Sequence, residues 1–208
     1  MGSFIGGMLS RRHNVVLIGR SEHVDAIRAH GLRIMGKTSV IAKPDASTTV
    51  PQNAKPDLVF VTTKAYDTPD AMLALQRLAD RSTFVTLQNG LGNADTIAKT
   101  ARRVVAGTTA IGVTYVGPGE IRHAGVGDTV LGAWSHVDAE ELRHRTLLIA
   151  KRTAANRGSM LQDLDRRHRT EIDAITGPIV RAAARHRIGV PLNQAMYAVV
   201  RARESAAE

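Results

Sequence analysis

Two hydroxyl groups and three carboxylates lie close together near the end of the sequence, in residues 158–163 and 169–173. Both segments adjoin apolar residues at helical spacing, a setting better suited to holding a small polar ligand than to filling a core. Thr170 and Asp173 have the spacing of a capping box, which predicts a helix start. Glu171 is then expected in the first turn, where the helix dipole favours a carboxylate. A helix-start acid without any ligand is the simpler interpretation of Glu171.

Three predicted strands lead to polar residues that could meet a ligand. Apolar runs at 14–18, 57–63 and 83–87 precede Arg20, Lys64 and Asn89. Ligands of open α/β sheets gather at the carboxyl ends of strands, so we expect these three side chains to form one site. An arginine at the position of Arg20 accommodates the 2′-phosphate of NADP, whereas an acid would hold the ribose hydroxyl of NAD. The alternatives without a ligand are a solvated arginine, a solvated lysine and a plain Asn-Gly turn.

The order of the C-terminal motif, together with these strand ends, resembles one family. Ser-Met-Leu-Gln-Asp, a basic spacer and Thr-Glu-Ile-Asp are similar to the signature of ketopantoate reductase, also called 2-dehydropantoate 2-reductase. The resemblance implies an α/β fold, with a Rossmann-type NADP-binding domain at 1–134. A shortened all-α domain at 135–208 would bind substrate and support a possible homodimer.

The same resemblance implies an activity, which is the NADPH-dependent reduction of ketopantoate, a 2-oxo acid, to pantoate. This reaction is a step toward pantothenate and coenzyme A. Two alternatives stay open. The chain could be a catalytically impaired remnant that only binds nucleotide, or it could reduce another 2-oxo acid.

Roles for individual residues also follow from the resemblance. Asn89 and Ser159 would hydrogen-bond the substrate, Glu171 would contact the substrate and the cofactor edge, and Asp163 would orient neighbouring polar groups. These four form the expected catalytic set. A helix-cap serine is the alternative interpretation of Ser159, and a solvated acid that balances nearby arginines is the alternative for Asp163. The cofactor contacts implied in this way are Gly2, Arg20, Lys64, Asn89, Val113 and Glu171.

Two parts of the family pattern have no counterpart in this sequence. Family members begin with a strand and the fingerprint Gly-x-Gly-Ala-Met-Gly-Ser, of whose three glycines only the third, Gly2, is present here. We therefore expect the first strand to be missing, which would leave unpaired strand edges in the middle of the sheet. A start assigned to an internal methionine would explain the gap.

The second absent part follows residue 134, where the family carries paired asparagines and the lysine that acts as general acid. Here the sequence passes almost directly to a helix predicted over 138–156. Loss of a general acid typically lowers the rate by about 10²–10⁴. Lys151 is nearby but matches no motif position, so we assign it no role.

The end of the chain predicts two further helices. The helix that starts near Glu171 contains Pro178, which should kink it near Ile175, and we expect it to end at Gly189-Val190-Pro191. Asn193 would then cap a final helix with Met196 and Val199 facing inward.

Composition limits the remaining classes of function. The 208 residues are 43% hydrophobic and 23% charged, which is typical of a soluble globular protein, and they include no cysteine. The eight histidines are scattered, so no metal site is indicated. No apolar run approaches the ~20 residues of a membrane span, and cytoplasmic residence is the default.

The basic charge raises nucleic-acid binding as a rival function. The net charge is +9, but acids are interleaved throughout and aromatic residues make up only 3% of the chain, too few for a stacking platform. A basic surface also suits a polyanionic cofactor and a carboxylate substrate, so we expect neither a nucleic acid nor a membrane as partner.

Overall fold

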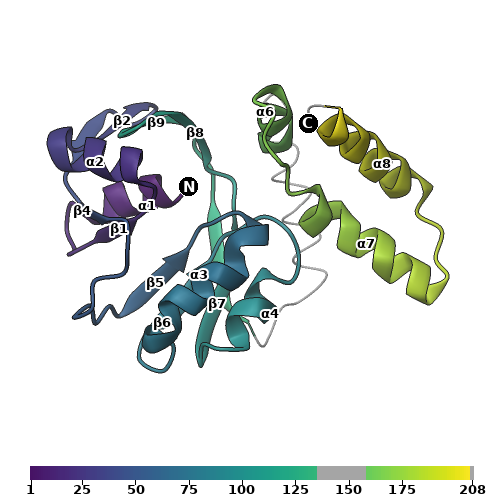
Figure 1. Ribbon diagram of the computed structural model, residues 1–208, viewed down its shortest axis with the longest axis horizontal. Coiled ribbons are helices and arrows are strands. Elements are labelled where there is room, and N and C mark those ends of the chain that lie inside the picture. The colour runs from purple at the N-terminus through teal and green to yellow at the C-terminus, as the bar shows by residue number, and fades with distance from the viewer. Residues whose placement is uncertain (135–157, 207–208) are drawn as a thin grey trace.

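The computed structural model describes residues 1–134 and 158–206. Within these ranges an α/β region comes first and three helices follow it, which confirms the predicted fold class (Figure 1). The helix expected over 138–156 lies outside the described residues. Within the described ranges no helix is long and apolar enough to cross a membrane, and no three His, Cys, Asp or Glu side chains gather to hold a metal ion.

The N-terminal part of the α/β region packs two helices against two small sheets. The helices are α1 (Gly2–Leu9) and α2 (Ser21–His30). Strand β1 (Val16–Ile18) pairs in parallel with β4 (Asp45–Ser47). The second sheet has the order β3 (Val40–Ala42), β2 (Leu32–Gly36), β9 (Glu120–Gly125) and β8 (Gly112–Gly117). Alternating residues of these strands face a core built around Phe4, Val24, Ile27, Leu32, Ile34 and Ile121.

A third sheet has the order β10 (Thr129–Ala133), β7 (Arg103–Thr109), β6 (Thr83–Thr86) and β5 (Leu58–Val61). Strands β5, β6 and β7 run parallel, so the carboxyl ends of β5 and β6 lie side by side. The connections contain η1 (Ala65–Asp67), α3 (Thr68–Leu75), η2 (Gln76–Leu78) and α4 (Asn93–Ala98). The core of this part is Val61, Met72, Leu78, Phe84, Ile97 and Ala101.

Strands β1 and β5 each have one edge without a described partner strand. Among the described residues, β1 pairs only with β4 and β5 pairs only with β6. Val16 and Leu58 are 43% and 54% exposed, although the strands of parallel sheets are usually buried on both faces. Helix α1 approaches both strands so closely that a side-chain carbon at Gly6 would collide with Leu17, and one at Gly2 would collide with Thr62.

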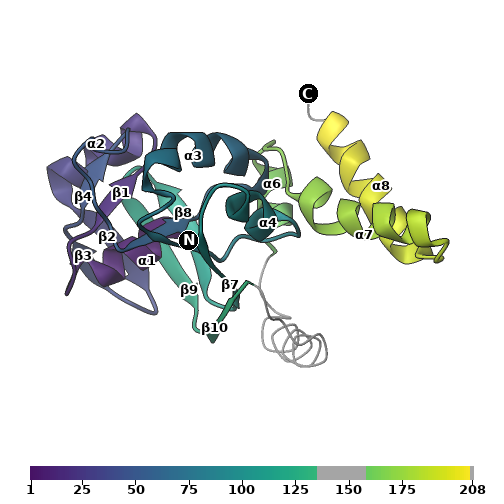
Figure 2. The same ribbon diagram turned by 90° about the horizontal axis from the view of Figure 1, so that it is seen from below.

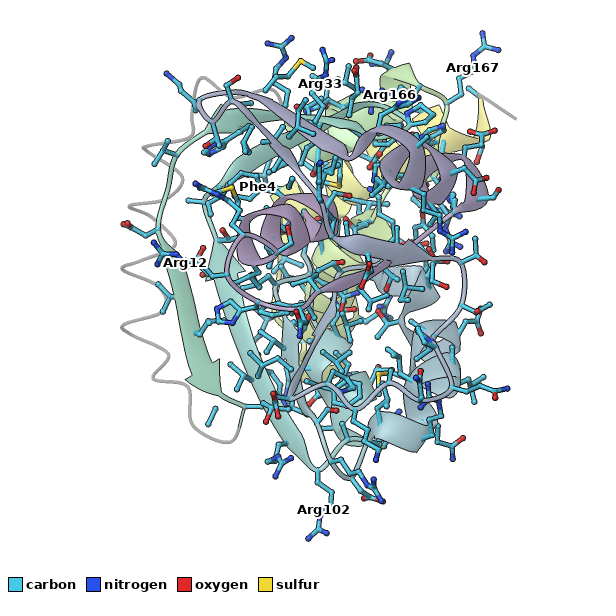
Figure 3. All side chains as sticks on the ribbon, turned by 90° about the vertical axis from the view of Figure 1, so that its left-hand side faces the viewer. Phe4, Arg12, Arg33, Arg102, Arg166 and Arg167 are labelled. Carbon is cyan, nitrogen blue, oxygen red and sulfur yellow. The ribbon has the colours of Figure 1, made fainter. Side chains whose placement is uncertain are left out.

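Residues 158–206 form α6 (Ser159–Asp165), α7 (Ile172–His186) and α8 (Pro191–Ser205). Figures 1 and 2 place α6 and the start of α7 beside the α/β region, while α8 and the end of α7 extend away from it. Helices α7 and α8 pack against each other. Figure 3 shows Phe4 inside the fold and arginines such as Arg12, Arg33 and Arg102 extending outward.

The predicted capping box is wrong. The Asp173 carboxylate does not accept a hydrogen bond from the Thr170 N–H, which instead donates to Glu204 Oε1 at 2.6 Å. The carboxylate of Asp173 accepts from the Tyr197 hydroxyl at 2.7 Å. The Thr170 hydroxyl accepts the Ile172 N–H at 3.2 Å, and Glu171 is the N-cap residue rather than a residue of the first turn. Residues of α8 have replaced the local partners that sequence spacing suggested.

The boundaries of the last two helices also differ from the prediction. Helix α7 continues past Pro178 to His186, and Arg187 ends it in the left-handed conformation at φ 55°. Helix α8 starts at Pro191, because a proline at the first position gives up an N–H that would have no helical partner. Asn193 therefore lies inside the helix. Met196 and Val199 are exposed in this chain, contrary to the expectation that they face inward.

Candidate active site

Lys64 joins the α/β region to the C-terminal helices. It leaves β5 in an extended conformation (φ −64°, ψ 150°) and stands at the start of η1. Its Nζ lies 2.7 Å from Asp163 Oδ2 and 3.8 Å from Glu171 Oε2. Three residues that the sequence placed in one site are thus brought together, and we call Lys64, Asp163 and Glu171 the Lys64 cluster.

Glu171 fixes the start of α7 against the turn after β5. Its side chain is only 7% exposed. Oε1 accepts the Ala65 N–H at 3.0 Å, while Oε2 faces the Lys64 ammonium. Both carboxylate oxygens therefore have a partner across the junction, and Glu171 is more than a helix-start acid stabilised by its own helix.

Asp163 is likewise not the solvated acid of the alternative interpretation. Its side chain is 14% exposed, and the Lys64 hydrogen bond at 2.7 Å connects it to β5 across 99 residues of sequence. Helix α6 is tied a second time to the α/β region, because Arg166 Nη2 donates to the Tyr115 carbonyl of β8 at 3.3 Å.

The cluster keeps Lys64 charged. Partial burial by itself would lower the pKa of Lys64, but the hydrogen bond and charge of Asp163 and the charge of Glu171 outweigh burial, and the pKa is raised. Burial, with the neighbouring acids, raises the pKa of Tyr66 against the opposing charge of Lys64. An ammonium and a neutral phenol therefore stand next to each other at neutral pH, both able to donate a hydrogen bond.

Sequence reasoning assigned no role to Tyr66 and Arg169, which the structure stacks beside the cluster. The Arg169 guanidinium carbon lies 4.8 Å from the centroid of the Tyr66 ring. Arg169 Nη2 also reaches Asp173 Oδ2 at 3.4 Å. The available signal was adjacency, since Tyr66 follows Lys64 by two residues and Arg169 precedes Glu171 by two.

The turn after β6 lies against the start of α7. The Leu91 N–H donates to the Ala174 carbonyl at 2.9 Å, and Gly90 has a φ of 94°. A Cβ on Gly90 would lie 2.8 Å from that same carbonyl oxygen, so the turn needs glycine for space as well as for conformation. The Asn89 carbonyl accepts from Asn93 Nδ2 at 2.9 Å, while the Asn89 side chain is exposed and bonds to no described residue.

Ser159 is exposed at the start of α6, where Gly158 is the N-cap residue and no side chain caps the helix. The helix-cap interpretation of Ser159 is therefore wrong. Its hydroxyl makes no hydrogen bond to a residue in the described ranges. Ser159 and Asn89 both offer polar groups that no described side chain occupies.

Arg20 stands apart from Lys64 and Asn89 in the sheet topology. It is the exposed N-cap residue of α2, and it follows β1, which belongs to a separate sheet. The expectation that all three residues share one sheet edge is wrong, because β1 and β5 do not pair. Val113 lies in β8 and packs against the N-terminal core.

The groups present at these strand ends suit a phosphorylated dinucleotide. The N-terminus of α1 starts at Gly2, whose Cα is so close to Thr62 that only glycine fits, and helix N-termini bind phosphate through free N–H groups. Arg20 offers an exposed guanidinium, and Asn89 offers an exposed amide.

Two family models match the chain. Ketopantoate reductase PanE/ApbA matches residues 1–136, and the C-terminal model of the same family matches residues 82–204.

Individual relatives agree with this match. The chain is 28% identical over 289 aligned positions to 2-dehydropantoate 2-reductase from Pyrococcus horikoshii, covering 99% of this chain and 95% of the relative. It is 29% identical to the enzyme of that name from Halobacterium salinarum, covering 97% and 95%. An alignment of 289 positions exceeds the 208 residues of this chain, so the relative contains segments without a counterpart here. The predicted absence of the first strand stays a prediction.

Solved structures show the same fold. The PanE/ApbA family ketopantoate reductase from Ralstonia eutropha JMP134 has a TM-score of 0.81 at 27% identity, covering 97% of this chain and 94% of that one. D-mandelate dehydrogenase, solved with NADH and anilino(oxo)acetate, has a TM-score of 0.85 at 21% identity, covering 100% and 96%.

Proposed function

This chain belongs to the ketopantoate reductase PanE/ApbA family, and we propose that it reduces ketopantoate to pantoate with NADPH, a step of pantothenate and coenzyme A biosynthesis. The family consists of oxidoreductases that use a nicotinamide dinucleotide. The observation that carries the proposal is the Lys64 cluster, in which an ammonium at a strand end is held by two carboxylates from the C-terminal helices.

NADP(H) is the proposed cofactor because of the residues at the other strand end. Arg20 is exposed at the carboxyl end of β1, the place at which an arginine accommodates a 2′-phosphate. Gly2 would allow the pyrophosphate to approach the start of α1. When bound, the reduced nicotinamide supplies the hydride that the C2 carbon of the 2-oxo acid accepts.

Lys64 would act on the oxygen of the same carbonyl group. Negative charge develops on that oxygen as C2 is reduced, and an ammonium at hydrogen-bond distance stabilises the charge and donates a proton. Asp163 and Glu171 orient the ammonium and keep it protonated through its raised pKa. The general-acid role falls to Lys64 in this proposal, because the family segment that carries the general-acid lysine has no counterpart after residue 134 of this sequence.

The exposed polar groups of Asn89 and Ser159 complete the proposed substrate contacts. Neither side chain bonds to a described residue, so each is available to a hydroxyl or carboxylate of the substrate. In the proposed step, Lys64 donates its proton to the oxygen that becomes the product hydroxyl, and Lys64 then regains a proton from solvent.

Reduction of another 2-oxo acid is the second candidate. It is favoured by the likeness in fold to D-mandelate dehydrogenase, whose structure contains anilino(oxo)acetate. The segments that the longer alignments contain and this chain lacks would also alter which side chains of the substrate are accepted.

The test is the absorbance of reduced nicotinamide, followed with ketopantoate, with phenylglyoxylate and with neither. We expect oxidation of NADPH that depends on ketopantoate and exceeds the rate with phenylglyoxylate. Faster turnover of phenylglyoxylate would support the second candidate. Binding of NADPH with no oxidation by either acid would identify a nucleotide-binding remnant.

A further inference from the structure

Arg169 is a cation beside the Lys64 cluster that the proposed mechanism leaves unused. Its guanidinium carbon lies over the Tyr66 ring, 4.8 Å from the ring centroid. The chain between Arg169 and Glu171 runs along the turn between Lys64 and Tyr66, because Glu171 accepts the Ala65 N–H. Arg169 is therefore fixed at the same junction as the reacting ammonium.

The guanidinium of Arg169 has donors to spare. Its side chain is 57% exposed, and its contact to Asp173 at 3.4 Å is at the long end for a hydrogen bond. Asp173 already accepts the Tyr197 hydroxyl at 2.7 Å and lies 3.6 Å from Arg201. Stacking on a ring occupies the face of a guanidinium and leaves its N–H edge free for a planar carboxylate.

The charge of the cluster creates a need for such a cation. Lys64 contributes one positive charge, while Asp163 and Glu171 contribute two negative charges, so the cluster is negative overall. An anionic 2-oxo acid that approached Lys64 alone would be repelled by the two acids. Arg169 supplies the compensating charge at this junction.

We propose that Arg169, held by the Tyr66 ring, binds the carboxylate of the substrate and thereby selects 2-oxo acids over uncharged ketones. The substrate class rests on the proposed function. The carbonyl oxygen would face Lys64, and the carboxylate would face Arg169, so the two cations divide the polar ends of the substrate between them.

The experiment titrates ketopantoate, and separately its uncharged lactone, into the full chain saturated with NADP⁺, a state that allows binding without reduction. The variants are Arg169→Met, Arg169→Lys and the control Arg185→Met, which removes the same charge from the exposed far end of α7. We expect Arg169→Met to weaken ketopantoate binding about 10- to 100-fold, the usual effect of losing a charge-assisted hydrogen bond. Arg169→Lys should weaken ketopantoate binding less, and Arg185→Met should bind ketopantoate as tightly as the wild type does.

Binding of the lactone and of NADP⁺ should change less than threefold in every variant, which separates anchoring from a structural role. Ketopantoate binding that is equal in wild type and Arg169→Met would overturn the inference. So would a wild-type chain that binds NADP⁺ but no ketopantoate. If binding depends on Arg169 but NADPH is never oxidised, the anchor stands and the proposed reaction fails. If wild type and Arg169→Met oxidise NADPH equally, the proposed reaction stands and the Arg169 anchor fails.

Discussion

Two basic residues follow parallel strands of this protein and have opposite surroundings. Lys64, after β5, contacts two largely buried carboxylates from α6 and the start of α7. Arg20, after β1, is exposed and bonds to no side chain in the described ranges. The same local pattern, an apolar strand ending at a cation, thus produces an ammonium held by two carboxylates at one strand end and an exposed guanidinium at the other.

Under the proposed function, this difference corresponds to two separate roles, reaction at Lys64 and phosphate recognition at Arg20. A group that reacts must be held in one geometry, and the carboxylates hold Lys64. A group that only recognises a phosphate needs to be accessible, and Arg20 is. We therefore expect changes at the two strand ends to affect different steps.

The largest effect should follow Lys64→Met. Loss of the proton donor should lower kcat/KM for ketopantoate by about 10²–10⁴, while NADPH binding changes far less. Steady-state absorbance measurements test this, with Lys55→Met, an exposed lysine in a loop, as the control. A loss below tenfold would remove Lys64 from the chemistry.

A smaller effect is expected for Arg20→Ala, which should weaken NADPH about 10- to 100-fold and leave NADH affinity unchanged. Calorimetry with NADPH and with NADH measures the preference for NADPH. The matched control is Arg12→Ala, which removes another exposed arginine. Equal weakening of NADPH and NADH would show that Arg20 does not recognise the phosphate.

Asp163→Asn should shift the pH profile rather than abolish activity. Asp163 is the strongest of the neighbours that raise the pKa of Lys64, so its neutralisation should lower that pKa. Activity that needs the ammonium is present below the pKa of Lys64 and lost above it. The alkaline limb of kcat should therefore begin at lower pH in Asp163→Asn and stay in place in the control Asp80→Asn.

The smallest effect concerns stability away from the cluster. The Tyr197 hydrogen bond, with help from Arg201 and Arg169, lowers the pKa of Asp173 despite its partial burial. Because the pKa of Asp173 is lower in the folded protein, its ionisation stabilises the fold at pH values above its pKa in the unfolded chain, about 4. That stabilisation disappears as the pH falls through the pKa of Asp173 in the folded protein.

Tyr197→Phe should cost about 0.5–1 kcal/mol at neutral pH, a modest amount because solvent screens the partly exposed Asp173. Urea unfolding of wild type and Tyr197→Phe at pH 7 and pH 3 measures the difference in their free energies of unfolding. This difference should be smaller at pH 3. A cost that stayed constant with pH would point to packing of the ring rather than to the carboxylate.

Local patterns were sufficient to predict the strands that precede Lys64 and Asn89, while the α/β class followed from the family resemblance. The runs before Lys64 and Asn89 form β5 and β6, because apolar residues in short runs indicate buried strands. Sequence spacing could not place β1 in a separate sheet, since sheet pairing depends on residues far apart in the chain. Arg20 therefore follows a strand of a different sheet from the strands that precede Lys64 and Asn89.

Contacts across the junction explain the other differences. Lys64 and Asp163 are 99 residues apart, and only the motif resemblance put them in one site. The capping box failed because Glu204 and Tyr197, both on α8, bind the groups that Thr170 and Asp173 would have offered each other. Arg169 and Tyr66 were missed because nothing in either segment alone indicates that they stack.

The central claim, that one dinucleotide lies across both strand ends, is tested most directly with adenosine 2′,5′-bisphosphate. This fragment carries the phosphorylated ribose without the nicotinamide. Calorimetry should show that Arg20→Ala weakens its binding at least tenfold, and that Lys64→Met leaves its binding as in the wild type. Binding that ignored Arg20, or that depended equally on Lys64, would contradict the account.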